Sequence, residues 1–201
     1  MKKFAFAFAL AIASLGAARA QTWVPVADAA SKPLRYVAGA GLTYGGQKIL
    51  TAYFTNGNRV DIDGGGSVIL YAGLDYRAGP QFSVQGTVGY HVDSAAGMNG
   101  DVRFERVPVE LLGYFHVNDK VRAGAGLRHV TGVGLRAGGV GQEQIGDHEF
   151  EDTTGALAEI EYLYSPQLGF KLRFVNDKFK EKTDGATIRG NHVGALVNFY
   201  F

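Results

Sequence analysis

The feature that most constrains the fold of this chain is an apolar side chain at every second residue, in eight segments between Arg35 and Phe201. Successive side chains of a β-strand point to opposite faces, so this alternation predicts strands that each have one apolar face. No series with helical spacing has a comparable length. The sequence therefore predicts an all-β chain of eight strands. The apolar series begin at Tyr36, Val68, Phe82, Val107, Val121, Ala156, Leu168 and Val193.

The opposite faces of these segments carry the polar and charged side chains. They include Asp75, Arg77, Gln85, His91, Glu110, His116, Arg122, Arg128, Glu159, Glu161, Lys171, Arg173, His192 and Asn198. A transmembrane barrel has an apolar outer face and a polar interior, the inverse of a soluble barrel. Because so many charges on one face need an enclosed interior, the pattern favours a transmembrane barrel over a secreted β-sandwich, which also alternates. Tyrosine and phenylalanine near the strand ends are expected to form an aromatic girdle.

The connections between the segments alternate in length. Short turns are expected at residues 79–81, 118–120 and 165–167, and long, polar, glycine-rich loops at about 45–66, 93–103, 136–153 and 180–188. This asymmetry is typical of up-and-down barrels with short periplasmic turns and longer outer loops. In the first long loop, Asn56-Gly57 lies between two alternating stretches, which predicts a hairpin that extends beyond the membrane as a ribbon.

Short turns fix the pairing of the strands beside them, so cross-strand partners can be counted from each turn. If Val117 pairs with Val121, opposed residue numbers sum to 238, and in the hairpin around residues 165–167 they sum to 332. These registers oppose unlike charges on the inward face, in the pairs Glu110–Arg128, Glu159–Arg173 and Glu161–Lys171. An eight-stranded barrel is just wide enough to be filled by side chains. We therefore expect a lumen plugged by ion pairs, in which exchanging the charges of Glu159 and Arg173 preserves stability.

The first residues have the pattern of a secretory leader. Met1-Lys2-Lys3 is basic, the run from Phe4 to Leu15 is uncharged and apolar, and Ala18-Arg19-Ala20 fits the small-residue cleavage pattern. The apolar run is too short for a membrane-spanning helix, which needs about 20 residues. We expect a cleaved signal peptide over residues 1–20, an extended lead-in over 21–34 and the barrel over 35–201.

Composition excludes several functional classes. The chain has no cysteine, so it has no disulfide, no thiolate metal site and no cysteine nucleophile. Without Lys2, Lys3 and Arg19, the 20 lysines and arginines fall to 17 against 19 acidic residues, a net charge of −2. This balance argues against nucleic-acid binding, which needs a basic surface.

The leader, the eight alternating segments, the loop asymmetry and the terminal phenylalanine together resemble the small OmpA/OmpX/OmpW-like outer-membrane β-barrels of Gram-negative bacteria. The resemblance covers residues 35–201 and implies an eight-stranded antiparallel up-and-down transmembrane β-barrel, inserted in the outer membrane after export to the periplasm. Phe201, Phe199 and Val197 look like the C-terminal signal that the barrel-assembly machinery reads. The implied partners are outer-membrane lipid and lipopolysaccharide, this machinery and periplasmic chaperones. The barrel is expected to be a monomer.

His129 and Thr131 are weak catalytic candidates. Their parity places both outward near a long loop, and a histidine base beside a hydroxyl nucleophile suits acyl transfer. The pair is similar to the outward His-x-Ser of the outer-membrane lipid A deacylases. It departs from that pattern because Thr131 replaces serine, Gly132 stands where the family has asparagine, and only loop acids such as Glu143 or Glu149 are available to orient the histidine. Polar residues at the end of a strand are the simpler interpretation.

His148 lies among four acidic residues, Asp147, Glu149, Glu151 and Asp152. Carboxylate oxygens suit a hard cation, but this segment lacks the glycine-spaced ligands of a dedicated calcium loop. A solvated acidic loop is therefore expected, with no metal and no cofactor.

Gly64-Gly65-Gly66 is predicted as a hinge between a loop and a strand, because no helix follows it as in a phosphate-binding loop. With no enzyme motif established, the sequence predicts a non-enzymatic barrel with a structural or surface-interaction role. Passage of small hydrophobic solutes is the alternative, and lipid A deacylation is a more distant one.

Overall fold

The computed structural model describes residues 33–53, 59–97, 100–139 and 146–201. The predicted signal peptide and residues 21–32 of the predicted lead-in lie outside the described residues. The first strand begins at Leu34, one residue before the predicted start of the barrel. Within the described ranges there is no helix long and apolar enough to cross a membrane.

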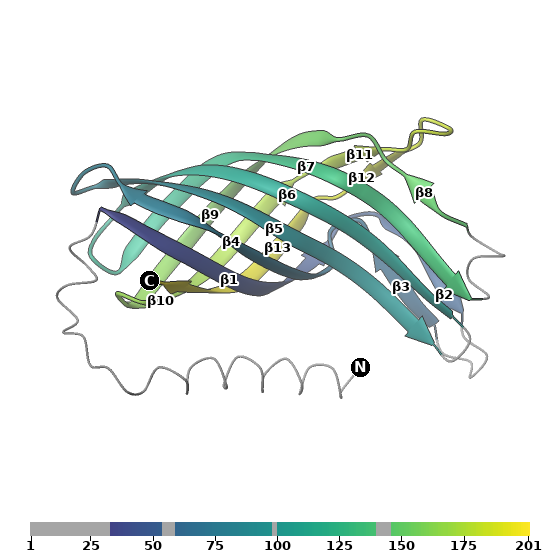
Figure 1. The fold of residues 1–201 in the computed structure, drawn as a ribbon, viewed down its shortest axis with the longest axis horizontal. Helices are drawn as coiled ribbons and strands as arrows, with labels where there is room; N and C mark the ends of the chain where they lie inside the picture. Colours follow the sequence, from purple (N-terminus) through teal and green to yellow (C-terminus); the bar gives the residue numbers. More distant parts are fainter. Residues whose placement is uncertain (1–32, 54–58, 98–99, 140–145) are drawn as a thin grey trace. The chain divides into compact units, whose positions relative to one another are not determined.

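Eight antiparallel strands form a closed barrel, in which each strand pairs with the one before it and the one after it along the chain (Figure 1). These strands are β1 (Leu34–Gly45), β4 (Ser67–Arg77), β5 (Phe82–Gly97), β6 (Gly100–His116), β7 (Val121–Gly139), β9 (Thr153–Ser165), β10 (Leu168–Asn176) and β13 (His192–Tyr200). β1 pairs with β13 and closes the barrel. The predicted fold class, an all-β eight-stranded antiparallel up-and-down barrel, is confirmed.

Five shorter strands lie at the end of the barrel that bears the long connections, the loop end; the end with the short turns is the turn end (Figure 1). They are β2 (Lys48–Tyr53), β3 (Arg59–Asp63), β8 (His148–Glu149), β11 (Lys178–Lys180) and β12 (Thr187–Arg189). β2 and β3 pair as the predicted ribbon, although its Asn56-Gly57 turn lies outside the described residues. β11 and β12 continue the register of β10 and β13, since Val175 pairs with His192 and Lys178 with Arg189.

The loop end contains more regular strand than expected from the sequence, which is a correction. β5 runs through Gly97 and β6 begins at Gly100, so residues 93–97 and 100–103 extend the barrel wall. β7 likewise continues to Gly139. The inward faces of these extensions are apolar, and together with the ribbons they bury one cluster. The cluster contains Ile62, Ala95, Val102, Phe104, Val130, Val133, Leu135, Phe150 and Phe179.

A β-bulge at Gly132 explains why the period-two pattern does not show the β7 members of this cluster. Gly132 has φ +60°, a left-handed conformation that glycine adopts without steric cost. The register of β7 against β6 shifts there, and both Val130 and Val133 are buried. Because a bulge adds one residue to one strand, odd-numbered side chains point inward beyond it, as Leu135 does. The period-two pattern of β7 is therefore interrupted at this position.

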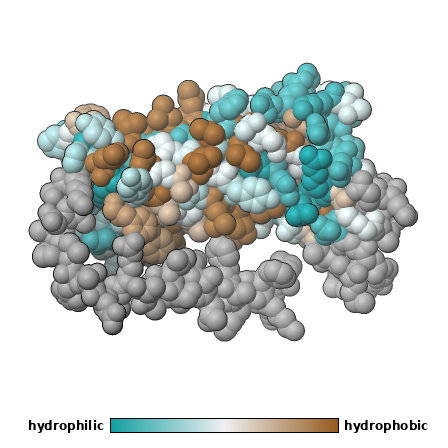
Figure 2. Space-filling model, viewed as in Figure 1, coloured by the Kyte–Doolittle hydropathy of each residue, from teal (hydrophilic) through white to brown (hydrophobic). Residues whose placement is uncertain are grey.

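The outer face of the barrel is apolar, as predicted. Large hydrophobic side chains such as Leu42, Leu111, Leu127 and Leu172 are exposed around the wall. Figure 2 shows apolar atoms over the middle of the strands and hydrophilic atoms toward the loop end. Exposed aromatic side chains lie near the strand ends, among them Tyr36, Tyr44, Tyr76, Phe82, Phe115, Tyr164 and Phe174. This is the surface that a bilayer with an aromatic girdle requires.

We expect the mature chain to refold in detergent as a heat-modifiable barrel. A closed barrel pairs its backbone N–H and C=O groups internally, so detergent does not unfold it until heat breaks the ladder. The measurement compares gel mobility of boiled and unboiled samples, with circular dichroism in parallel. A mainly helical spectrum, or full solubility without detergent, would exclude this fold.

Candidate functional site

The turn half of the lumen holds an ion-pair network centred on Arg122 of β7. Its guanidinium lies 2.8 Å from the Asp75 carboxylate and 2.7 Å from that of Glu161. It also donates to the Tyr200 hydroxyl, which in turn donates to Glu161. The Arg122 guanidinium stacks 4.1 Å from the ring centroid of Tyr114. These contacts join five strands, β4, β6, β7, β9 and β13, across the lumen.

A second network fills the middle of the lumen with alternating charges. The Lys171 ammonium lies 2.9 Å from the Glu159 carboxylate. Arg173 pairs with Glu159 and, at 2.8 Å, with Glu110. Glu110 also accepts from Arg128 at 2.5 Å. Three of the central charges, Glu110, Glu159 and Arg173, therefore each have two partners of opposite sign.

The counted registers can be compared directly with this arrangement. The structure places Glu110 opposite Arg128, Glu159 opposite Arg173 and Glu161 opposite Lys171. In the third pair, however, the side chains do not form an ion pair. Glu161 also lies opposite Arg122 of β7, which takes its carboxylate, and Lys171 binds Glu159 instead. The β7–β9 register crosses a long connection, so it could not be counted from a short turn.

The buried charges of the barrel are nearly balanced. The buried carboxylates are Asp75, Asp93, Glu110, Glu159, Glu161 and Asp177, and the buried bases are Arg106, Arg122, Arg128, Lys171 and Arg173. Arg35, which pairs with Asp75 at 2.6 Å, brings the bases to the same number as the acids. Arg122, Arg128, Glu161 and Asn198 are 0% exposed, so side chains fill the lumen at these levels.

Arg106 marks the boundary between the ionic interior and the apolar cluster, and sequence analysis did not single it out. Its guanidinium donates to the carbonyl oxygens of Gly64 and Gly66 and lies 4.7 Å from the Phe104 ring centroid. The Gly64–Gly66 segment thus presents acceptors to a cation, the opposite of a phosphate cradle. At Gly65 a Cβ atom would lie 2.7 Å from the His192 Cβ, so the close approach of the chains requires glycine there.

The β2–β3 ribbon is tied to the barrel at the same level. The backbone N–H of Asp63 donates to the Asp93 carboxylate at 2.9 Å, and Lys48 pairs with Asp61 at 3.0 Å. Burial raises the pKa of the Asp63 carboxyl and the nearby Asp61 raises it further, while Lys48 opposes both. The Asp63–Asp93 hydrogen bond therefore ties the ribbon to the barrel wall, whereas the Lys48–Asp61 pair joins β2 to β3 within the ribbon.

His129 and Thr131 do not form a catalytic pair with a carboxylate in the described structure. His129 is exposed on the outer face, as expected, and its Nδ1 lies 3.0 Å from the Thr154 hydroxyl. The Glu149 carboxylate is held by Lys182 at 3.1 Å, so it does not orient the histidine. Glu143 lies outside the described residues. What remains is a histidine–threonine contact at the end of two strands.

Basic side chains of neighbouring strands neutralise the loop acids. The pairs are Arg136–Asp147 at 3.4 Å, Arg136–Glu149 at 3.7 Å, Lys182–Glu149 at 3.1 Å and Lys180–Glu151 at 2.9 Å. His148 Nδ1 lies 2.6 Å from the Glu181 carboxylate. Among the described residues, no group of three or more histidine and acidic side chains is placed to hold a metal ion.

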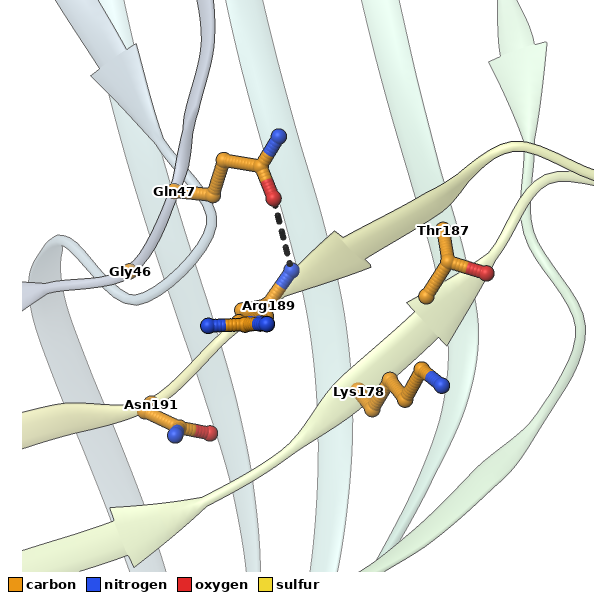
Figure 3. A pocket seen from close by; sticks show the side chains of 6 residues that line it. All are labelled: Gly46, Gln47, Lys178, Thr187, Arg189 and Asn191. Carbon is orange, nitrogen blue, oxygen red and sulfur yellow. Dashed lines mark hydrogen bonds between the residues drawn. The ribbon is translucent and has the colours of Figure 1, made fainter.

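An open pocket of about 680 Å³ lies at the loop end, between the segment after β1 and the β11–β12 ribbon (Figure 3). Its lining is polar and basic, and consists of Gly46, Gln47, Lys178, Thr187, Arg189 and Asn191. Lys178 and Arg189 are directly opposed across the ribbon. This pairing could not be counted from the sequence, because the β10–β13 register also crosses a long connection.

We expect Glu159→Gln to lower the free energy of unfolding by about 3 kcal/mol, because Lys171 and Arg173 would remain buried with less compensation. The measurement is the urea midpoint of the refolded barrel. Glu151→Gln is the matched control: its partner Lys180 is 55% exposed, so its loss should cost less than about 1 kcal/mol. Equal effects of the two variants would contradict the buried network.

The exchange of Glu159 and Arg173 should not restore stability, which corrects the expectation from sequence. With Glu159→Arg and Arg173→Glu combined, the introduced arginine would lie beside Lys171 and the introduced glutamate beside Glu110. Like charges at these distances repel in a buried site. Full recovery in the double variant would mean that the pair acts independently of its neighbours.

Comparison with known proteins gives matches in structure only. No family model and no curated protein sequence matches the chain. Among solved structures, Neisserial surface protein A (NspA) aligns with a TM-score of 0.51 at 14% identity, covering 85% of this chain and 98% of that one. Ail, the attachment invasion locus protein of Yersinia pestis, in complex with the heparin analogue sucrose octasulfate, aligns with a TM-score of 0.51 at 13% identity, covering 85% and 100%. The outer membrane protein OprG from Pseudomonas aeruginosa has a TM-score of 0.47 at 10% identity, covering 84% and 96%.

The closed barrel agrees with the matches to NspA and Ail. At identities of 13–14% the structural likeness shows the fold alone, and the activity has to be argued from the site. The chain has the fold of the small eight-stranded outer-membrane β-barrels.

Proposed function

We propose that this chain is a non-enzymatic outer-membrane barrel with a structural or surface-interaction role. In this proposal residues 1–20 direct export to the periplasm, periplasmic chaperones and the barrel-assembly machinery then insert the barrel as a monomer, and lipid and lipopolysaccharide surround it. The observation that carries the proposal is the filled lumen. Arg122 and Glu161 lie in its turn half with no exposed surface, and their partners come from opposite walls.

The loop end supports a surface role because it is ordered by its own core. Phe104 contacts Phe150 and Phe179 edge-on, with centroids 5.5 Å and 5.6 Å apart. Burial of such rings stabilises the ribbons against the barrel wall. The loop end can therefore present β2, β3, β8, β11 and β12 to the exterior in a fixed arrangement. Ail, which has the same fold, is named for attachment and invasion.

Two other functions are less well supported. Passage of small hydrophobic solutes would need a path through the buried apolar cluster and past Arg106, which is itself fully buried. Lipid A deacylation would need a nucleophile and an oriented base, but the described contact of His129 is with Thr154. Both remain outcomes of the experiment below.

The mature protein refolded into lipopolysaccharide-containing bilayers should show no conductance above protein-free bilayers, because ion pairs fill the lumen. The mass of lipid A recovered from the same sample should be unchanged, and identical in His129→Ala. Stepwise conductance would establish a channel. If lipid A loses an acyl chain with the natural sequence but keeps it with His129→Ala, the protein would be established as a deacylase.

We expect Phe201→Ala to lower outer-membrane assembly in cells while in vitro refolding stays unchanged. The substitution keeps the two backbone hydrogen bonds between Phe201 and Tyr36 at the barrel seam, which deletion of Phe201 would remove. The proposed signal consists of Phe201, Phe199 and Val197, and the substitution removes only the exposed ring of its last residue. Phe115→Ala is the control, an exposed aromatic at the same end within a strand. Equal assembly defects in the two variants would exclude a terminal signal.

A further inference from the structure

Two basic residues occupy directly opposed strand positions on the outer surface of the loop end. Lys178 of β11 and Arg189 of β12 are directly opposed partners, and both side chains are exposed. Like charges in directly opposed positions destabilise a sheet. No carboxylate among the described residues lies within ion-pair distance of either side chain. The ribbon therefore has a concentration of positive charge that the described protein does not neutralise.

Other basic side chains at the loop end are paired, which sets these two apart. The pairs are Lys48–Asp61, Arg103–Asp101, Arg136–Asp147, Lys180–Glu151 and Lys182–Glu149, at 2.9–3.4 Å. Lys180 is two residues from Lys178 on the same face of the same strand, yet it has a carboxylate partner. The absence of a carboxylate partner at Lys178 among the described residues is thus a local property of this site and not a general feature of the surface.

The hairpin of β10–β13 and its extension locate the pair relative to the membrane. Its outward pairs are Phe170–Val197, Leu172–Ala195 and Phe174–Val193, and then, beyond Asn176 and Asn191, Lys178–Arg189. Lys178 is four residues beyond Phe174, about 13 Å along an extended chain. With strands tilted by about 40°, this is about 10 Å along the membrane normal. The cations therefore lie just above the apolar band, at the level of lipid headgroups.

The pocket around the pair offers further hydrogen-bond donors. Gln47, Thr187 and Asn191 line it together with the two cations (Figure 3). The backbone N–H of Gln47 donates to the carbonyl of Arg189 at 2.6 Å, and the Gln47 side-chain oxygen accepts from the backbone N–H of Arg189 at 3.5 Å. These contacts fix the Arg189 backbone, and they use the side-chain oxygen of Gln47 and not its amide nitrogen.

We propose that Lys178 and Arg189 form a binding site for the phosphate group of an outer-leaflet lipid headgroup, with Gln47, Thr187 and Asn191 as neutral donors. Guanidinium and ammonium groups bind phosphate oxygens through charge-assisted hydrogen bonds, and the guanidinium can do so in a bidentate manner. A bound phosphate removes the repulsion between the two cations. The lipid is favoured over a free anion because the apolar pairs directly below the site, such as Phe174–Val193, can contact its acyl chains.

The test measures protection of the refolded mature protein against heat in zwitterionic detergent. Bisphosphorylated lipid A should raise the unfolding midpoint of the natural sequence, since a ligand that binds only the folded state stabilises it. In Lys178→Gln combined with Arg189→Gln, the concentration needed for the same shift should rise about tenfold or more, from the loss of two charge-assisted contacts. Without lipid, this variant should unfold at an equal or higher temperature, because the repulsion is gone.

The matched control is Lys180→Gln combined with Lys182→Gln, which removes the same net charge at the same end outside the pocket. This variant should need no more than about threefold more lipid A than the natural sequence for the same shift of the unfolding midpoint. It loses only the screened, long-range attraction between its surface charge and the lipid phosphates. Equal weakening in the two double variants would overturn the site. So would equal protection by dephosphorylated lipid A, and protection by inorganic phosphate at the same concentration would overturn its assignment to a lipid. The site rests on the proposed membrane placement and not on a closed lumen, so a conducting barrel would leave this test valid.

Discussion

Closure of the backbone hydrogen-bond ladder is the constraint on which the rest of this structure depends. In hydrocarbon an unpaired N–H or C=O group costs several kcal/mol, so the first and last strands must meet, as β1 and β13 do. Eight strands then enclose a lumen with room for side chains only. Charged side chains cannot face the lipid, so those of the spanning strands point into the lumen and must neutralise one another there. This is why carboxylates and basic groups are buried in the lumen in nearly equal number.

The narrow lumen also explains why the interior charges act as a network. Arg173 contacts both Glu159 and Glu110, and Glu110 contacts both Arg173 and Arg128. The contribution of one such pair to stability depends on its neighbours, so it cannot be measured by changing that pair alone. The ionic interior therefore specifies one arrangement of side chains, and a charge exchange that looks neutral on a register diagram is not neutral in the lumen.

The part of the fold that follows from local rules could be predicted from sequence. The registers beside the short turns are correct because a three-residue turn leaves one pairing that keeps both apolar faces outward. The pairings β7–β9 and β10–β13 cross long connections, and nothing local fixes them. For that reason the partner of Glu161 and the opposition of Lys178 and Arg189 could not be predicted. Arg106 binds the carbonyl groups of Gly64 and Gly66, in a segment between strands that no strand register places. The β7 members of the apolar cluster could not be predicted because Gly132 shifts the parity of β7, and Ala95 and Val102 lie in a segment that was expected to be a loop.

The medium outside the barrel changes along the strands, and the side of the wall that carries the apolar side chains changes with it. On β6, Leu111 and Val109 point outward with Glu110 inside, whereas farther along Arg103 points outward with Phe104 and Val102 inside. The first arrangement suits lipid outside the barrel and the second suits water. The 17 residues of β6 and 19 of β7 exceed the 9–11 that a tilted spanning strand needs, so their loop-end parts lie beyond the bilayer. The inversion between Val109 and Phe104 therefore marks where β6 leaves the bilayer, and Arg106 lies in this interval as the last buried charge of β6.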